Sequence, residues 1–477
     1  MRNIVCVLLG AGLLCGMHGA LAAEPVTAQD LAEPARVEES LGLGLAQVFS
    51  HEVLFAADGK EEVVPLKLKE LVSLAQKTRL EGALGREKVN EALGRSWQAM
   101  APLLPQLEGG ISQARTFKQN LDAMGFRGYG VIGPFNTFDA RLRLTQKILD
   151  VSAAAGAGEG RAAVNISRYE EEFTRQKIVL TASLLYLEAL RAQGDFQAAA
   201  AGVALSERLL RQAQSRKNVG TAAAIDVARA KTRLAGDQLR EDRTRTALHD
   251  AYLELQRAAG IPYDRAIRLM NSLCFIREAV PSVTEALALA AKERLDMRIA
   301  AEQARAAGLV LTRARGQWAP VVAIAVDYGI SGNEPRRNED KTGGIMVSAM
   351  MPLFEGGRII GEVKAASSRQ RQARLVQEDL ARQVEEDVRR ALWRVTDAEA
   401  EVDTAARVVT LARQEMDLAS HRFAEGVADH IEVINSQTSL AEARDAYLAA
   451  LTQYHGARMN VYFALGEPES FFLKDAI

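Results

Sequence analysis

The sequence predicts a mostly α-helical protein built from long coiled-coil hairpins, together with four β-strands that contribute to a membrane β-barrel. Three observations support this fold class. Residues 216–262 and 422–468 align without a gap and share 14 identities. Apolar residues recur every seven positions in the stretch that precedes the second copy. Segments of about ten residues with alternating polarity lie between the helical stretches. A repeat of this length indicates one supersecondary unit that is used twice.

The N-terminus has the features of a secretory signal peptide, which we assign to residues 1–23. Arg2 supplies a positive charge, a short apolar run follows, and Ala20-Leu21-Ala22 is a cleavage site of the A-x-A type. Lipidation of Cys15 is an alternative that stays open, although Leu14 precedes it where a small residue is preferred. Either assignment predicts an exported protein.

The composition excludes several classes of partner and constraint. The chain of 477 residues carries a formal net charge of −2 and has no basic patch, so nucleic acid is not a predicted partner. Cys274 is the single cysteine beyond residue 23, which rules out an intramolecular disulfide in the mature chain. No later run of eighteen apolar residues occurs, so insertion into a membrane would require a closed barrel.

The two copies divide the mature chain into segments. In order, we expect an N-terminal extended segment (24–66), a first structural repeat of helix, two strands and helical hairpin (67–262), an inter-repeat linker (263–280), a second structural repeat (281–468) and a C-terminal tail (469–477). The first repeat is expected to begin with a helical stretch from about Leu68 to Leu103, and the second with a helix from about Val283 to Trp318; a proline stops each of them.

The clearest alternation lies in the second strand of the first repeat. Four charged side chains are expected to face a wet lumen, namely Asp139, Arg141, Arg143 and Lys147. The intervening apolar residues Phe138, Ala140, Leu142 and Leu144, with Ile148, are expected to face lipid. A soluble strand pair with one buried face is the alternative explanation of this pattern.

The second repeat alternates in the same way. Val322, Ile324, Val326, Tyr328 and Ile330 share one face of its first strand, and Ile345, Val347, Ala349, Met351 and Leu353 share one face of the next. Four strands are too few to close a membrane barrel, for which about eight are needed. The sequence therefore predicts that several subunits share one barrel.

The long helical stretch from Arg358 to Ala424 carries a heptad seam. Valine or methionine recurs every seven residues, at Val388, Val395, Val402, Val409 and Met416, and alanines alternate with them. A continuous helix of this length would extend roughly 100 Å. We interpret it as a structural coiled coil, followed by a turn at Gly426 and a return helix.

The sequence offers no motif for catalysis. The G-x-G-x-x-G match at Gly128–Gly133 is followed by Pro134 and a strand, whereas a nucleotide-binding loop precedes a helix. The histidines show no metal-ligand spacing. We therefore predict no cofactor, no metal and no enzymatic activity.

Four segments together resemble the TolC family of outer-membrane efflux and secretion channels. They are "APLLPQL" (101–107), "LRLTQKILD" (142–150), "MPLFEGGR" (351–358) and the duplicated glycine-turn phrase. The resemblance covers about Leu68 to Pro468. It implies a homotrimer with a shared twelve-stranded barrel and an α-helical tunnel, in the outer membrane of a Gram-negative-type bacterium and extending into the periplasm.

The resemblance also implies a function and partners. The channel would be the passive exit duct of a tripartite efflux pump or a type I secretion system, with a periplasmic adaptor protein and an inner-membrane transporter as partners. The adaptor-docking tips would be Val219, Gly220 and Thr221 in the first copy and Glu425, Gly426 and Val427 in the second. Glu425 departs from the apolar residue usual in the family.

The acids that follow the two tips are the candidate constriction. By the resemblance, Asp226 and Glu432 would form rings of carboxylates. An acidic residue that complements the dipole in a helix's first turn is the plainer alternative. The family's closed-state lock is not carried over, because Ala428 and Asn435 stand at two of its positions. The alternative function from another class is a periplasmic coiled-coil adaptor or scaffold.

Overall fold

The computed structural model describes residues 63–126, 128, 130–220, 223–427 and 429–474. The predicted signal peptide and most of the N-terminal segment lie outside these residues. All described residues belong to one compact unit that begins at His51. No described helix carries an apolar stretch of the length and hydropathy needed to cross a membrane.

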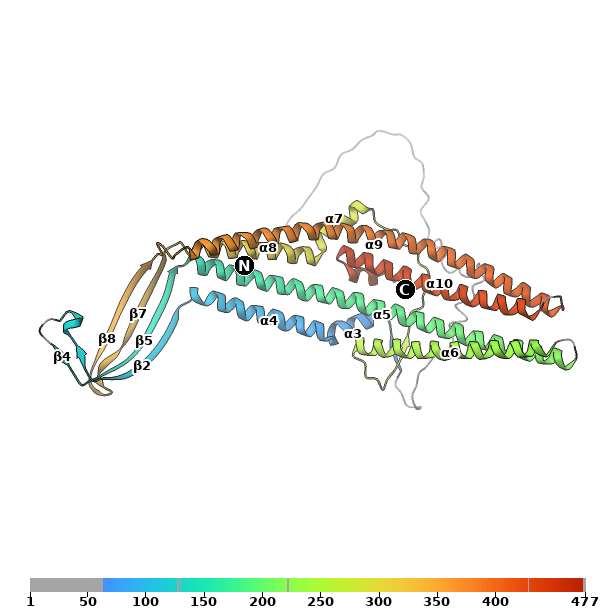
Figure 1. The fold of residues 1–477 in the computed structure, drawn as a ribbon, viewed down its shortest axis with the longest axis horizontal. Coiled ribbons are helices and arrows are strands. Elements are labelled where there is room, and N and C mark those ends of the chain that lie inside the picture. Colours follow the sequence, from blue (N-terminus) through green and yellow to red (C-terminus); the bar gives the residue numbers. More distant parts are fainter. Residues whose placement is uncertain (1–62, 127, 129, 221–222, 428, 475–477) are drawn as a thin grey trace, which may run out of the picture. The chain divides into compact units, whose positions relative to one another are not determined.

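The order of elements repeats along the chain (Figure 1). The first half contains β1 (Val63–Leu66), α3 (Leu68–Thr78), α4 (Leu80–Met100), β2 (Gln106–Thr116), the short strands β3 (Gln119–Asn120) and β4 (Val131–Ile132), β5 (Phe135–Leu149), α5 (Val151–Asn218) and α6 (Ala224–Ala259). The second half contains β6 (Ala266–Leu269), α7 (Val283–Glu293), α8 (Leu295–Gly316), β7 (Val321–Glu334), β8 (Arg337–Met350), α9 (Arg358–Ala424) and α10 (His430–Leu465). Within the described residues, 3-10 turns cover Ala101–Leu103, Asp122–Met124 and Pro468–Lys474.

The first helical stretch of each repeat is divided into two helices, so the single helix predicted from about Val283 to Trp318 was wrong. Arg79 separates α3 from α4 and Arg294 separates α7 from α8, each with an extended backbone. Neither break is at glycine or proline. At the second break the Arg294 guanidinium is buried and pairs with Asp296 at 2.6 Å and Asp387 at 3.4 Å. The second break is therefore marked by a buried, ion-paired arginine, whose own N–H still donates to the Ala290 carbonyl oxygen at 3.0 Å.

The glycines that end α6 and α10 fit against these breaks. Gly260 and Gly466 have φ values of 68° and 88°, in the left-handed region that favours glycine. A Cβ at Gly260 would lie 2.8 Å from the Thr78 side chain, and one at Gly466 would lie 2.8 Å from the carbonyl carbon of Glu293. Each return helix thus ends against the break in the first helix of its own repeat.

Four long strands form one antiparallel sheet in the order β2-β5-β7-β8. The register places Leu144 of β5 opposite Val326 of β7, and Val326 opposite Ile345 of β8. Because directly opposite residues point to the same side of a sheet, the apolar series predicted for these strands share one face. Leu107 in β2 lies opposite Leu144 and joins that face.

Two details of the predicted faces need correction. β8 ends at Met350, so Met351 and Leu353 lie in the loop that follows and not in the strand. The register of β5 shifts between Lys147 and Leu149, which takes Ile148 out of the strict alternation. A bulge at the end of a strand adds one residue and so breaks the period of two.

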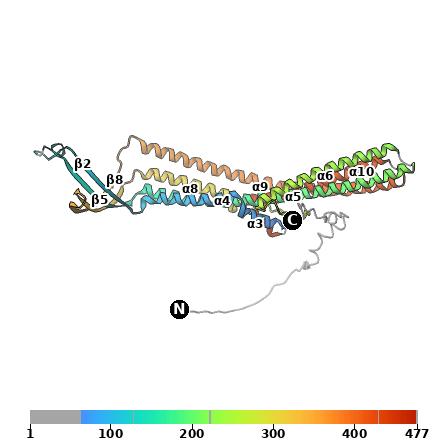
Figure 2. The same ribbon diagram turned by 90° about the horizontal axis from the view of Figure 1, so that it is seen from below.

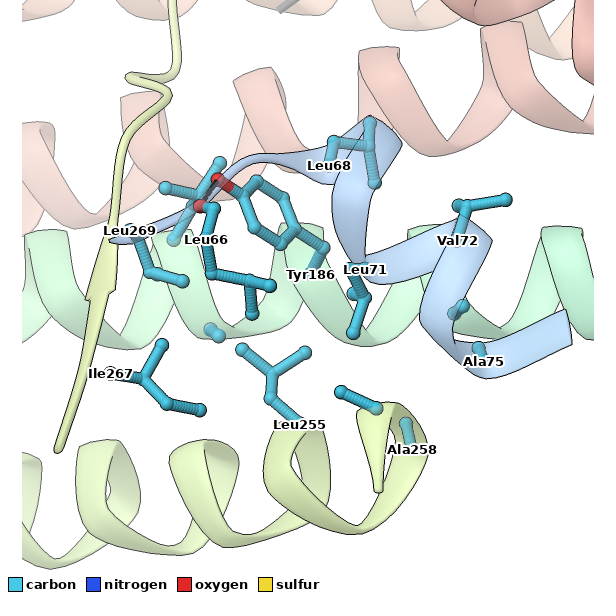
Figure 3. Packing of buried hydrophobic residues seen from close by; sticks show 14 of the residues in the cluster. Leu66, Leu68, Leu71, Val72, Ala75, Tyr186, Leu255, Ala258, Ile267 and Leu269 are labelled. Carbon is cyan, nitrogen blue, oxygen red and sulfur yellow. Dashed lines mark hydrogen bonds between the residues drawn. The ribbon is translucent and has the colours of Figure 1, made fainter. Parts of the chain in front are cut away.

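The helices of the described residues pack into several apolar cores, two of which are extensive. In the first, β1 pairs in parallel with β6, and Leu66, Leu71, Tyr186 and Leu255 are buried around the pair (Figure 3). The Tyr186 hydroxyl donates to the Leu66 carbonyl oxygen over 2.9 Å. The last residues of the segment 24–66 and the first part of the segment 263–280 are therefore joined as a parallel strand pair.

The second core follows the predicted heptad seam of α9. Val388, Val395 and Val402 are buried against Leu451 and Tyr454 of α10. The two helices lie side by side as a hairpin, and α5 and α6 form the other hairpin (Figures 1 and 2). The expected continuous helix from Arg358 to Ala424 is confirmed with those bounds.

Candidate functional site at the two hairpin turns

The two hairpin turns are built by the duplicated phrase. α5 ends at Asn218 and is followed by Gly220 with φ of 78°, and α9 ends at Ala424 and is followed by Gly426 with φ of 79°. A Cβ at either glycine would meet nothing within 4 Å. The requirement for glycine is therefore conformational, because other residues pay a steric cost at positive φ.

Apolar side chains are exposed at both turns. Val219 is 73% exposed and Val427 is 70% exposed, and Ile225 and Ile431 are also exposed on the first turns of α6 and α10. Glu425 is exposed beside them. Thr221, the remaining predicted docking residue, lies outside the described residues, as does Ala428. The two turns thus present apolar surface, with one added carboxylate at the second.

The two candidate constriction acids have different surroundings. Asp226 accepts a hydrogen bond from the Ala223 amide at 3.1 Å, and its other oxygen lies 3.8 Å from Arg229. Glu432 lies 3.6 Å from Arg422, across its own turn. The geometry of Asp226 fits the plainer alternative, an acid that caps and complements the start of a helix. Both carboxylates face an arginine of their own hairpin.

Arg216 connects the first turn to the second. One guanidinium nitrogen of Arg216 donates to the carbonyl oxygens of Phe423 at 2.7 Å and of Ala424 at 3.1 Å. Its guanidinium carbon also lies 4.2 Å from the centre of the Phe423 ring. A cation at the C-terminal carbonyls of α9 complements the helix dipole, so this contact ties the end of α5 to the end of α9.

A second connection between the hairpins lies farther from the turns, and we call it the inter-hairpin junction. It consists of Ser206 on α5, Asp237 and Arg233 on α6, and Gln437 and Thr438 on α10. Asp237 is 8% exposed and accepts from Ser206 at 2.5 Å, from Arg233 at 3.0 Å and from Gln437 at 3.2 Å. Arg233 also donates to Thr438 at 2.7 Å. One buried carboxylate thus joins three helices.

A groove runs between α6 and α10 from the turns to this junction. It has a volume of about 830 Å³ and is lined near the turns by Ile225, Ala228, Ile431 and Ile434 with the charged Arg229 among them, and farther along by Arg233 and Asp237. The apolar end lies next to the exposed residues of the turns. The two turns and this groove form one continuous surface.

The charged face of the sheet carries the four residues predicted to face a lumen. Asp139, Arg141, Arg143 and Lys147 alternate with the apolar residues of β5. Arg141 pairs with Asp139 at 2.9 Å and with Asp327 of β7 at 3.0 Å, and Lys147 pairs with Asp150 at 2.8 Å. One face of the sheet therefore carries these charged side chains, together with Met346 and Met350 of β8, and the opposite face carries the apolar series.

A family model described as "Outer membrane efflux protein" matches residues 74–261 and 286–467. The chain belongs to this family. The two matched segments fall within the two structural repeats that the sequence predicts. No group of three or more His, Cys, Asp or Glu side chains within the described residues is arranged to hold a metal ion.

Relatives of this outer membrane efflux protein come from several bacteria. Outer membrane protein TolC of Salmonella enteritidis is 25% identical over 394 residues, which cover 80% of this chain and 76% of that protein. Alkaline protease secretion protein AprF of Pseudomonas aeruginosa is 23% identical over 385 residues, which cover 78% of this chain and 79% of that protein.

Solved structures share the fold. The CmeC outer membrane channel of Campylobacter jejuni matches with a TM-score of 0.74 at 17% identity, over 86% of this chain and 89% of that chain. The outer membrane protein VceC of Vibrio cholerae matches with a TM-score of 0.72 at 17% identity, over 84% and 96%. The architecture of long helical hairpins and four strands is thus that of outer-membrane channels.

Sequence reasoning about this family member missed Arg216 and the inter-hairpin junction. A signal for Arg216 was present, because the duplicated phrase aligns it with Arg422. The aligned arginines make different contacts: Arg216 reaches the other hairpin, whereas Arg422 faces Glu432 of its own hairpin. Asp237 had no such signal, because its aligned position is Ala443.

Proposed function

We propose that the protein is the outer-membrane exit duct of a tripartite efflux pump or a type I secretion system. The observation that carries the proposal is the sheet with one exposed apolar face and one charged face. Leu107, Ile111, Leu142, Tyr328 and Ile345 are between 56% and 81% exposed on the apolar face. An apolar face against lipid and a charged face toward water are what a membrane strand requires.

The proposed assembly is a homotrimer. Within the chain, β2 and β8 are the edges of the four-stranded sheet. An unpaired edge is a template for another strand, and four strands are too few to close a barrel. Three copies joined edge to edge would give twelve strands, and the helices would continue as a tunnel into the periplasm. The charged residues Asp139, Arg141, Arg143 and Lys147 would then face the lumen.

The hairpin turns would dock a periplasmic adaptor protein, which connects the duct to an energised inner-membrane transporter. Support comes from the exposed apolar residues Val219 and Val427 and from the groove beside them, since contiguous exposed apolar surface marks interaction sites. Glu425 would give the second turn a charge that the first lacks. The contribution of Thr221 rests on the resemblance alone.

The relatives are named for different kinds of cargo. AprF is named for alkaline protease secretion, and OpmQ of Pseudomonas putida is named for pyoverdine export. A protein and a small molecule thus leave through related ducts. The inner-membrane transporter, rather than the polar lumen, would choose what is exported.

The carboxylates Asp226 and Glu432 are proposed to line the constriction. Three-fold symmetry would place three copies of each around the axis, and rings of like charge select permeating ions and bind cations. The pairing of Glu432 with Arg422 is long and exposed, which leaves the carboxylate accessible to such a cation.

Two experiments test the proposal. A high-salt or alkaline wash of membranes should leave the protein in the pellet, and its release would favour the periplasmic scaffold instead. In planar bilayers, Glu432→Gln should change single-channel conductance or its block by divalent cations, with Glu425→Gln as a nearby charge control. Identical conductance and block in wild type and Glu432→Gln would remove Glu432 from the constriction.

A further inference from the structure

A third set of charged side chains crosses from one hairpin to the other, beyond the inter-hairpin junction as seen from the turns, and we call it the charge layer. It consists of Arg191 and Asp195 on α5, Arg240 on α6 and Asp445 on α10. Arg240 donates to both carboxylate oxygens of Asp445, and Arg191 lies 3.7 Å from Asp195. Each carboxylate interacts electrostatically with both arginines. Two guanidinium groups on one hairpin thus face one carboxylate from each hairpin.

The helices α5 and α10 are in close contact at this layer. A Cβ on Gly194 would lie 3.1 Å from the Leu448 side chain, so there is little room between the two helices. Asp195 is the next residue of α5, and its side chain is only 27% exposed. α10 therefore contributes to the burial of Asp195, and separation of the two helices would return this carboxylate to water.

The surroundings of Asp195 disfavour its charged form. Burial raises the pKa of the Asp195 carboxyl to about 6. The guanidinium groups of Arg191 and Arg240 oppose this rise, and the carboxylates of Asp445 and Glu188 add to it. Asp195 therefore exchanges its proton near pH 6 while the hairpins are joined.

The second carboxylate of the layer is more firmly held. Burial also raises the pKa of the Asp445 carboxyl, Arg240 and Arg191 oppose this rise, and Glu442 of the same helix adds to it. Both oxygens of Asp445 accept hydrogen bonds from Arg240, whereas Asp195 lies 3.7 Å from its arginine. Asp445 is thus the anchored member of the layer, and Asp195 is the member that can change its charge without breaking the link between the hairpins.

We propose that Asp195 makes the joining of the two hairpins depend on pH, so that a protonated carboxyl holds α10 against α5 and an ionised one loosens this contact. An ionised Asp195 places a second negative charge near Asp445, where the helices partly exclude water. Protonation removes that repulsion, and Arg240 keeps its bonds to Asp445. Mild acid should therefore strengthen the connection between the hairpins. The inference goes beyond the proposed function, because it concerns the contact between the helices and not conduction.

The direction and size of the effect follow from proton linkage. The pKa of Asp195 is about 6 in the joined state, against an ordinary value of 3.8. The stabilisation is therefore fully present below pH 3.8 and is lost as the pH rises through 6. Where separation restores the ordinary pKa, joining is about tenfold more favourable at pH 5 than at pH 7.5.

The test measures the distance between α6 and α10 with two spin labels on the full-length protein. The labels are placed at Arg243→Cys on α6 and Ala446→Cys on α10, which are both exposed positions, and Cys274→Ser removes the cysteine beyond the predicted signal peptide. Arg216→Met and Asp237→Asn loosen the other two connections, so that a separated population can be measured. Circular dichroism checks that the helices persist, and Arg216→Met alone is the background if the double variant unfolds.

The expected result is a separated fraction about tenfold larger at pH 7.5 than at pH 5, with a midpoint near pH 6. Asp195→Asn mimics the protonated carboxyl and should keep the smaller fraction at both pH values. Glu207→Gln is the matched control, because Glu207 is also an acid of α5 that lies 3.7 Å from an arginine one turn away, but its side chain is 46% exposed. This control should leave the pH dependence unchanged.

Two results would overturn the inference. One is a separated fraction that is equal at the two pH values, including a single short distance at both. The other is a pH dependence that persists in Asp195→Asn, which would assign it to another group. Neither result bears on the proposed function, which the membrane wash tests separately.

Discussion

The contact of Arg216 with the end of α9 gives the sharpest prediction about the hairpin turns. Arg216→Met keeps the length of the side chain and removes its charge. The change takes away two hydrogen bonds to the Phe423 and Ala424 carbonyl oxygens and a cation–π contact at 4.2 Å. We therefore expect the two hairpins to separate more readily at their turns.

The magnitude follows from the contacts. A hydrogen bond that involves a charged group contributes about 1.5–3 kcal/mol, and a cation–π contact at a partly exposed site adds about 0.5–1 kcal/mol. Some of this is offset because Arg216 is half-buried and water can replace it. A net loss of about 2–3 kcal/mol corresponds to a shift of roughly 30- to 150-fold between joined and separated hairpins.

Arg422→Met is the matched control, because Arg422 occupies the same position in the second copy of the repeat. Its side chain is 55% exposed and lies 3.6 Å from Glu432, so its loss should cost about 0–1 kcal/mol. The assay is single-channel recording, together with a spin-label distance between the two turns. We expect longer open times and a broader distance distribution for Arg216→Met alone. If the two variants behave alike, Arg216 does not hold the hairpins together.

Three further predictions concern stability. Gly466→Ala should lower the free energy of unfolding by about 2–4 kcal/mol, because a Cβ there adds a backbone clash at 2.8 Å to the strain of positive φ. Gly426→Ala should lower it by only about 1–2 kcal/mol, because strain alone acts there. Equal shifts in melting temperature for the two variants would contradict this. Asp237→Asn should lower the free energy of unfolding by about 3 kcal/mol in denaturant titrations, since it leaves Arg233 without its carboxylate in a buried site; a neutral result would show that the junction is not held by charge. Burial lowers the pKa of the His455 imidazole to about 4, so the folded state disfavours its protonation. The stability that the neutral imidazole contributes above pH 6.5 should therefore be lost as the pH falls toward 4, by about 3 kcal/mol. His455→Gln should remove this pH dependence from a series of unfolding curves, and an unchanged dependence would assign it to other groups.

Much of the fold was predictable because its signals are local. The turn glycines, the period of two in the strands and the heptad seam of α9 each reflect a constraint that acts over a few residues. The break at Arg294 has no such signal. Its buried guanidinium pairs with Asp296, two residues away, at 2.6 Å, and also with Asp387, 93 residues away in sequence, at 3.4 Å, and the second partner is supplied by the tertiary fold. Single-sequence patterns do not contain that information.

The same distinction applies to the candidate site. Gly220 and Gly426 were predictable, since a hairpin of two helices needs a residue at positive φ. The partners of Arg216 were not, because nothing in the first copy indicates that its arginine reaches a carbonyl of the second. The different surroundings of Asp226 and Glu432 were hidden for the same reason. Alignment of the copies identifies equivalent positions, whereas contacts between the copies need not be equivalent.

Two connections between the hairpins, Arg216 at the turns and the inter-hairpin junction, differ in strength, and this difference sets the order in which they break. Arg216 acts at the turns, is half-buried and donates to backbone carbonyls that water can also satisfy. Asp237 lies about 20 Å along α6 from its first residue, is buried, and would leave unpaired polar groups behind if α10 moved away. Separation that starts at the turns costs about 2–3 kcal/mol, whereas separation at the junction adds the larger penalty of exposing a buried hub. The turns should therefore part before the junction does. Adding Asp237→Asn to Arg216→Met should extend the separation of the hairpins farther along α6. Asp237→Asn alone should leave the turns closed, because Arg216 still joins them.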